Sequence, residues 1–344
     1  MTGTAPLTVQ FKDASSGSPT SWAWDFDNDG TVDSTARNPR FIYRLPGTYS
    51  VMLKVTASSL TDTALRPGLI QVQPGPLASP LDPLLVGAGD IADCSSAGDE
   101  ATAALLDGIP GTVFTAGDNA YDSGTTTEFA KCYDPSWGRH KARTRPAPGN
   151  HDYYTSGARG YFDYFGAAAG DPRKGYYSYD LGGWHVVVLN SNCSAVGGCG
   201  AGSPQETWLR ADLAATSARC TIAYWHHPLF SSGEHGNSPE VKALWQALEG
   251  AGAELVVAGH DHMYERYAPQ RADGIADPNG IREIIVGTGG KSLYRLGTIR
   301  PNSEVTDNSS VGVLRLSLHA DGYTWEFLAA SGSAFVDAGS GFCH

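Results

Sequence analysis

The stretch ELVVAGHDHMYER, residues 254–266, decides the fold of this chain. An apolar run ends at Gly259, and His260 and His262 follow one residue apart. Because alternate side chains of an extended chain point to the same side, this pattern indicates a strand end that presents two imidazoles side by side.

Four other stretches also combine glycine turns with metal-ligating side chains: GDIAD (89–93), GDNAYDSG (117–124), GNHDYY (149–154) and WHHPLFSSGEHG (225–236). Ligands in open α/β sheets gather at the carboxyl ends of strands, and glycine lets the backbone turn there without steric cost. We therefore expect five strand ends to aim their donors at one point. Oxygen and imidazole donors suit transition metals, and this number of donors exceeds the needs of one ion. The donors are Asp90, Asp118, Asn150, His226, His260 and His262.

Each stretch alone has a simpler interpretation. A single Gly-Asp is usually a turn, an isolated Asn-His pair means little, and HHP is more often a packed or surface loop. The order and coincidence of all five stretches in one chain favour the metal site.

The chain divides near residue 75. Residues 1–73 are predicted to be all-β, because stretches such as TYSVMLKVTAS (48–58) alternate as a half-buried strand does. The proline-rich segment 74–83 is predicted to be a linker. Residues 84–344 alternate short apolar runs with helical patterns, as in PEVKALWQALEG (239–250), which predicts an α/β layered domain.

Composition narrows the possible functions. The net charge of −12 argues against a nucleic-acid partner, which would need a basic face. No apolar run reaches the length of a membrane helix. The six cysteines form no CxxC pair and favour disulfides in an oxidising compartment, with Cys193 and Cys199 bracketing a loop that could close on itself. The alternative is six buried free thiols.

The N-terminal segment resembles the PKD domain, a small β-sandwich with an immunoglobulin-like layout. The matching features are Trp24-Asp25-Phe26, an Asp-Gly turn, and Tyr43 followed by Pro46-Gly47-Thr48-Tyr49. The resemblance implies a spacer or a module that contacts a surface or polymer. The DxDxDGxxD spacing of its acidic turn could supply oxygen ligands to Ca²⁺, and the alternative is a solvated aspartate-rich turn. The acidic residues are Asp25, Asp27, Asp29 and Asp33.

Residues 84–330 resemble the calcineurin-like metallophosphoesterases and, within them, the purple acid phosphatases. That pattern runs GDxx, GDxxY, GNH[ED], a His two residues before a proline, then GHxH. It implies an α/β/β/α layered sandwich and a pair of metal ions. Many metallophosphoesterases begin with DxH, but Ile91 and Ala92 follow Asp90 here. Tyr121 would fill the vacancy with a phenolate, which favours Fe(III), unless it is a structural aromatic.

Carried over residue by residue, the resemblance implies that Asp118 bridges the two ions. Three residues would hold an Fe(III)-type ion, and three would hold a divalent ion (Zn, Fe or Mn). The first three are Asp90, Tyr121 and His262; the second three are Asn150, His226 and His260. His227 is interpreted as structural.

Two further histidines are expected to touch the substrate. His151 directly follows Asn150, and His235 stands nine residues after His226, where the family places a substrate-side histidine. Either could act as general acid. The alternatives are a structural role for His151 and a solvated loop position for His235.

Two departures from the family pattern affect the interpretation. Asp152 stands where many members have Glu, which we expect to be tolerated. Asp261 stands in the middle of GHDH, where we expect an extra carboxylate near the metals that could change the pH preference.

The resulting hypothesis is a secreted bacterial phosphatase. The resemblance implies hydrolysis of small-molecule phosphate monoesters by a metal-bound hydroxide. The alternatives are a phosphodiesterase or phospholipase-like esterase with the same metals, and a non-catalytic, metal-stabilised surface-binding protein. Neither GxSxG nor GxxxxGK[ST] occurs, so serine-hydrolase and P-loop chemistry lack support. No signal peptide is visible, and we interpret Met1-Thr-Gly-Thr as a truncated start.

Overall fold

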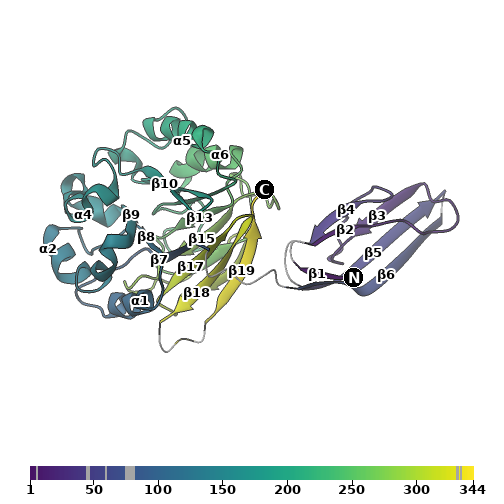
Figure 1. Ribbon diagram of the computed structural model, residues 1–344, viewed down its shortest axis with the longest axis horizontal. Helices are drawn as coiled ribbons and strands as arrows, with labels where there is room; N and C mark the ends of the chain where they lie inside the picture. Colours follow the sequence, from purple (N-terminus) through teal and green to yellow (C-terminus); the bar gives the residue numbers. More distant parts are fainter. Residues whose placement is uncertain (5–6, 44–46, 59, 74–81, 331–332, 334) are drawn as a thin grey trace. The chain divides into compact units, whose positions relative to one another are not determined.

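The computed structural model describes residues 1–4, 7–43, 47–58, 60–73, 82–330, 333 and 335–344. The chain forms two compact units, Met1–Pro80 and Leu81–His344 (Figure 1). Of the predicted linker over residues 74–83, residues 74–81 lie outside the described part of the chain.

The N-terminal unit is a β-sheet domain, as predicted. A four-stranded sheet has the order β1-β6-β5-β3, and β2 pairs with β4. Aromatic rings fill the core: Phe26 lies 4.4 Å from Phe41 between ring centroids, and the Tyr43 hydroxyl donates to the Phe26 carbonyl at 2.9 Å. The strands are β1 (Thr2–Thr4), β2 (Leu7–Gln10), β3 (Ser21–Asp25), β4 (Arg40–Tyr43), β5 (Gly47–Ala57) and β6 (Leu60–Gln73).

The C-terminal unit contains two large sheets. One has the order β10-β11-β12-β13-β15-β14-β16, and the other has the order β19-β18-β17-β7-β8-β9. The first comprises β10 (Tyr177–Leu181), β11 (Trp184–Val188), β12 (Cys220–Tyr224), β13 (Leu255–Ala258), β14 (Tyr264–Tyr267), β15 (Arg282–Val286) and β16 (Ser303–Asp307). The second comprises β7 (Leu84–Ala88), β8 (Thr112–Ala116), β9 (Thr144–Ala147), β17 (Gly312–His319), β18 (Gly322–Ala329) and β19 (Asp337–Phe342).

The two sheets pack face to face through large side chains. Phe114 of β8 and Tyr224 of β12 have ring centroids 5.4 Å apart, and Trp184 of β11 lies 5.8 Å from Tyr323 of β18. The parallel strands β7, β8, β12 and β13 are buried along nearly their whole length and are mostly apolar, because both of their faces are covered, whereas β18 alternates between buried and partly exposed residues.

Helices cover the outer faces of this sandwich (Figure 1). The helical pattern predicted over 239–250 is confirmed, because Leu244, Trp245 and Leu248 are fully buried against the larger sheet. The helices are α1 (Gly98–Asp107), α2 (Thr126–Glu128), α3 (Asn150–Tyr154), α4 (Arg159–Phe165), α5 (Pro204–Ala215) and α6 (Lys242–Gly250). Shorter 3₁₀ or π turns are η1 (Phe129–Tyr133), η2 (Trp137–Arg143), η3 (Ser156–Ala158), η4 (Gly166–Ala169), η5 (Cys193–Ala195) and η6 (Pro239–Val241).

The strand order explains why the five stretches meet. Strands β7, β8 and β9 are parallel neighbours in one sheet, and β12 and β13 are parallel neighbours in the other. Parallel neighbours end at the same sheet edge, and each of these strands runs into one of the five stretches.

All six cysteines are paired, which confirms the expectation of disulfides. The pairs are Cys94–Cys132, Cys193–Cys199 and Cys220–Cys343. None of the helices in the described part of the chain has the length and apolar character that crossing a bilayer requires.

Candidate metal centre

The first half of the candidate centre is a tight group of three side chains. The Tyr121 hydroxyl donates to Asp90 Oδ1 at 2.7 Å and lies 3.1 Å from His262 Nε2. His262 Nε2 is 3.3 Å from the same Asp90 oxygen. These residues follow β7, β8 and β13, so their donor atoms meet although the chain separates them widely.

The second half lies beside it. His226 Nε2 is 3.0 Å from Asn150 Oδ1 and 3.2 Å from His260 Nδ1. The other His226 nitrogen lies 2.8 Å from the carbonyl oxygen of Ala116, which orients the ring. Such support from the outer ring nitrogen is typical of metal-binding histidines.

Asp118 joins the two halves. Its Oδ2 accepts from Tyr121 at 3.0 Å and lies 3.3 Å from His226 Nε2. Its Oδ1 accepts the backbone N–H of His151 at 2.8 Å. The structure therefore brings all seven predicted donors together, with Asp118 between the two groups.

Backbone strain concentrates at this site. Asp90, Asp118 and His260 adopt left-handed φ angles of 61°, 50° and 73°. Such conformations cost non-glycine residues about 1–3 kcal/mol each and cluster at functional sites. Glycine is needed beside them, since a Cβ on Gly149 would lie 2.1 Å from Asp118 Oδ1.

Asp118 and His226 shift each other's pKa in opposite directions. Burial favours the protonated form of Asp118, but His226 and the nearby His151 outweigh burial and hold the pKa of the Asp118 carboxyl below its usual range. Burial alone would lower the pKa of His226, yet Asp118 raises it to about 9. These shifts favour an ionised Asp118 beside a protonated His226 at neutral pH.

Tyr121 and His260 are held neutral. Burial raises the pKa of Tyr121 well above its ordinary value, and the carboxylates of Asp118 and Asp90 raise it further. Burial, reinforced by His226, lowers the pKa of His260. A cation bound here would displace protons from the phenol and from His226, because metal ligands bind in their deprotonated forms.

The two proposed substrate-side histidines lie at the edge of the group. His151 Nε2 is 3.9 Å from Asp118 Oδ2, and its ring centroid is 4.6 Å from that of Tyr121. The His235 ring stacks on His260 with centroids 4.3 Å apart. Both histidines therefore adjoin the donor cluster from different loops.

Several neighbours were not singled out from the sequence. Tyr294 stacks on His262 with centroids 3.8 Å apart, and Lys291 Nζ lies 4.6 Å from the Tyr121 ring centroid. Both lie in GTGGKSLY (287–294), directly after β15, where a sixth apolar run ends in glycines. This apolar run followed by glycines is the sequence signal that could have pointed to them.

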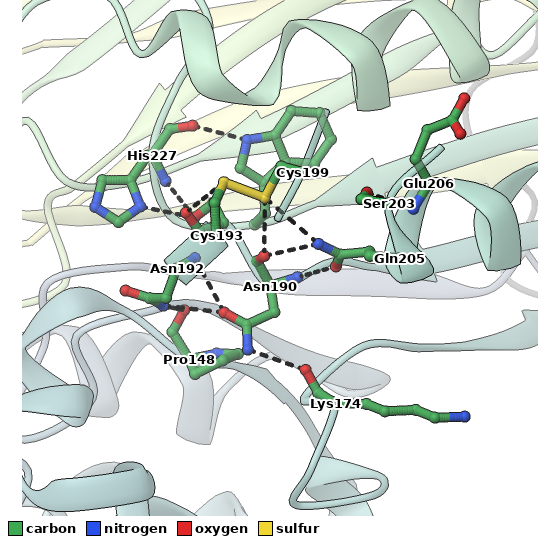
Figure 2. The surroundings of a disulfide bond; sticks show 12 residues. Pro148, Lys174, Asn190, Asn192, Cys193, Cys199, Ser203, Gln205, Glu206 and His227 are labelled. Atoms are coloured by element: carbon green, nitrogen blue, oxygen red, sulfur yellow. Dashed lines mark hydrogen bonds between the residues drawn. A yellow bond between two sulfur atoms is a disulfide. The ribbon is translucent and has the colours of Figure 1, made fainter. Parts of the chain in front are cut away.

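His227 connects the centre to a disulfide loop. Its Nδ1 lies 2.7 Å from Ser191 Oγ, and its ring centroid is 4.4 Å from that of His260. Figure 2 shows His227 beside the Cys193–Cys199 disulfide. The contact agrees with a structural interpretation of this histidine, and burial lowers its pKa to about 3.

Asp152 and Asp261, the two departures from the family pattern, both accept hydrogen bonds from nearby backbone N–H groups. Asp152 is fully buried and accepts the backbone N–H of Gly149 at 2.9 Å, behind the donors. Asp261 does not add its carboxylate to the donor cluster. It accepts hydrogen bonds from the backbone N–H of His235 at 2.9 Å and from the Ser231 hydroxyl. The Asp261 carboxylate therefore contacts the loop that carries His235 rather than the donor residues themselves.

The residues present fit a pair of cations. They offer two carboxylates, one phenol, one amide oxygen and three imidazoles, and Asp118 is shared. Mixed oxygen and nitrogen donors of this kind suit transition metals. In the N-terminal unit, carboxylate oxygens of Asp25, Asp27 and Asp29 also lie within 4.8 Å of one another.

Comparison with known proteins finds matches for both units. A family model described as "PKD domain" matches residues 2–67, and one described as "Calcineurin-like phosphoesterase" matches residues 84–264. Purple acid phosphatase 22 of Arabidopsis thaliana is 31% identical over 157 residues, which cover 42% of this chain and 34% of that protein. This chain thus matches about a third of that relative's length.

Solved structures share the fold. Purple acid phosphatase PPD1 from yellow lupin seeds has a TM-score of 0.62 at 17% identity, covering 98% of this chain and 74% of that one. GAP50, the anchor in the inner membrane complex of Plasmodium, has a TM-score of 0.55 at 14% identity, covering 74% and 88%. At such identities the likeness concerns the fold alone.

Proposed function

This chain belongs to the calcineurin-like phosphoesterase family, and from that premise we propose that it hydrolyses phosphate monoesters at a pair of metal ions. The observation that carries the proposal is the convergence of seven donors from five strand ends, with Asp118 shared between two groups. A structural metal site needs about four donors, so seven suggest a working centre.

Each donor has a proposed ion. Asp90, Tyr121 and His262 would hold an Fe(III)-type ion, because a phenolate is a hard anionic donor. Asn150, His226 and His260 would hold a divalent ion, with Asp118 shared. When bound, such a pair supplies Lewis-acid activation of water and neutralises phosphate oxygens.

The chain's own residues position the substrate and move protons. His151 and His235 adjoin the donors from separate loops, within reach of phosphate oxygens at the cluster. We assign them to bind those oxygens and to protonate the leaving alkoxide, a general-acid role that contributes about 10²–10⁴-fold. No protein nucleophile is required.

We further propose that the protein acts outside the cell. Three disulfides persist in oxidising compartments and are rare in reducing ones. A small phosphate ester is then the substrate, and the N-terminal unit serves as a spacer or contacts a surface.

The test compares nitrophenyl phosphate with bis-nitrophenyl phosphate, together with metal analysis. We expect two metal ions per chain and a kcat/KM at least about tenfold higher for the monoester, a difference of about 1.4 kcal/mol in transition-state binding. Asn150→Ala should lose metal and about 100-fold or more in kcat, because even residues that only orient a ligand cost 10–100-fold. Asn279→Ala, at an exposed turn, is the control.

Other results would point to the alternatives. A diester preference would indicate a phosphodiesterase or phospholipase-like esterase. A metal-loaded wild type without activity would indicate a non-catalytic binding protein.

A further inference from the structure

The loop from His226 to His235, hereafter the histidine loop, begins at a proposed metal ligand and ends at a proposed substrate-side residue. Three buried carboxylates hold it from one side: Asp261 after β13, Glu265 on β14 and Glu283 on β15. All three are fully buried. A buried carboxylate must be fully hydrogen-bonded, so their partners define what they hold.

Two carboxylates fix the middle of the loop. Glu283 accepts the backbone N–H groups of Leu229 and Phe230 at 2.9 and 3.0 Å. Glu265 accepts the backbone N–H of Ser232 at 2.9 Å. Together these hydrogen bonds hold the backbone N–H groups of Leu229, Phe230 and Ser232, so they restrict the backbone path toward His235.

Asp261 fixes the end of the loop. Its Oδ1 accepts a hydrogen bond from the backbone N–H of His235 at 2.9 Å, and its Oδ2 accepts one from the Ser231 hydroxyl. The same hydroxyl oxygen accepts the Gly233 N–H at 2.9 Å. The fit is close, since a Cβ on Gly233 would lie 2.2 Å from Asp261 Cγ.

The His235 imidazole remains directed to the metal centre. Its ring stacks on His260 at 4.3 Å and lies 5.4 Å from the Tyr294 ring. The side chain is thus placed from two sides: its backbone by Asp261 and its ring by His260, the residue before Asp261.

We propose that Asp261 is a positioning residue, whose carboxylate holds the His235 backbone so that the imidazole is aimed at the leaving group before substrate binds. The inference rests on the proposed phosphatase function and deepens it. One short segment, GHDH, would then supply two metal ligands and the fixed point for the general acid. Preorganisation of this kind matters because small misplacements cost large factors in rate.

The test uses leaving groups of different quality. Nitrophenolate departs without a proton, whereas the alkoxide of glycerol 2-phosphate needs a general acid. We expect Asp261→Ala to lose at least about tenfold more kcat on glycerol 2-phosphate than on nitrophenyl phosphate, as should His235→Ala. The double variant Asp261→Ala/His235→Ala should show the same ratio of the two losses as His235→Ala alone, because both substitutions remove the same general-acid contribution.

Conservative and matched variants separate positioning from general damage. Asp261→Asn keeps an oxygen acceptor for the His235 N–H and should restore most of the glycerol 2-phosphate activity. Glu254→Ala removes another buried carboxylate, one that accepts the Thr221 N–H at 2.6 Å at the amino end of β12. It should lower stability without changing the ratio of the two activities. Metal content should stay at two ions in every variant.

The outcomes are distinct. Equal losses on both esters in Asp261→Ala, or an additive double variant, would overturn the positioning role while leaving the phosphatase function intact. A metal-loaded wild type that hydrolyses neither ester would overturn the function and, with it, the role of Asp261. If Asp261→Ala does not fold, Ser231→Ala frees one carboxylate oxygen and should show the same preference in smaller measure; an unchanged ratio there would also overturn the proposal.

Discussion

The donor residues also form hydrogen bonds and ion pairs with one another. Tyr121 donates to two carboxylates, and His226 pairs with Asp118. Binding a cation would exchange these hydrogen bonds and protons for metal bonds. Contacts of this number around the donors explain how strained φ angles at Asp90 and His260 persist.

The proposed role of Tyr121 as an iron ligand predicts a colour. In iron-loaded protein, Tyr121→Phe should abolish a visible tyrosinate-to-iron absorption band, because no phenolate remains at the donor cluster. The measurement is the absorption spectrum with iron content determined in parallel. A wild type that binds iron without this band, or a coloured Tyr121→Phe, would show that the phenol is not a ligand.

Tyr133→Phe, which removes a tyrosine hydroxyl away from the donor residues, is the matched control for Tyr121→Phe. It also carries a separate prediction about stability. Tyr133 is fully buried, and within the described residues its hydroxyl has no hydrogen-bond partner. Removing an unsatisfied buried hydroxyl should leave the spectrum unchanged and raise the free energy of unfolding by about 1 kcal/mol. Urea unfolding checks this, and a loss of stability would reveal a partner for the hydroxyl.

Glu254 should make stability pH-dependent. Burial raises the pKa of Glu254 to about 7 from 4.5. The folded state then keeps a proton that the unfolded chain releases above pH 4.5, so stability falls as pH rises from about 4.5 to 7, by about 3 kcal/mol at most. Glu254→Gln cannot ionise and should flatten this slope in urea unfolding of metal-loaded protein. Glu240→Gln, at an exposed position, should retain it.

At the scale of elements, alternation and apolar runs were enough to predict most of the strands that carry the site. GDIAD, GDNAYDSG and GHDH follow β7, β8 and β13, as the apolar runs indicated, whereas GNHDYY follows β9, whose sequence TRPA is not an apolar run. Patterns within one stretch of sequence cannot predict contacts between elements that are distant in the chain. Such contacts determine the disulfide partners and the hydrogen bonds that hold the histidine loop. Cys94 pairs with Cys132 of η1, and Cys220 of β12 pairs with Cys343 after β19, far along the chain in both cases. The hydrogen bonds that Glu265 and Glu283 accept from the histidine loop depend on how β14 and β15 lie in the same sheet as β12 and β13.

The three disulfides should differ in their effect on stability. They close segments of very different length, with sequence separations of 6, 38 and 123. If each acts by restricting the unfolded chain, Cys193→Ser/Cys199→Ser should cost about 2.5 kcal/mol and Cys220→Ser/Cys343→Ser about 5 kcal/mol. Denaturant unfolding of the paired variants measures both. Equal costs would mean that native contacts around each bridge outweigh loop entropy.

At the scale of the whole molecule, each unit has its own core. Aromatic rings of Phe26, Phe41 and Tyr43 fill the N-terminal unit, and the two facing sheets fill the C-terminal one. A domain with its own core can unfold as its own cooperative step. Calorimetry in calcium-free buffer should therefore resolve two transitions, and chelation should lower only the one that belongs to the C-terminal unit, since a ligand stabilises only the unit that binds it. One merged transition that moves with chelator would contradict this.

The same experiment decides whether the acidic turn of the N-terminal unit binds calcium. Both carboxylate oxygens of Asp25 already accept turn N–H groups, from Asn28 at 2.6 Å and Gly30 at 2.9 Å. Burial and neighbouring carboxylates raise the pKa of Asp27, so a cation would relieve repulsion there. Calcium at ten times its dissociation constant would stabilise the unit by about 1.4 kcal/mol, which raises the midpoint of a small domain by about 6 °C or more. Asp27→Asn with Asp29→Asn should abolish the shift; an N-terminal transition that ignores calcium in the wild type would leave a solvated, aspartate-rich turn.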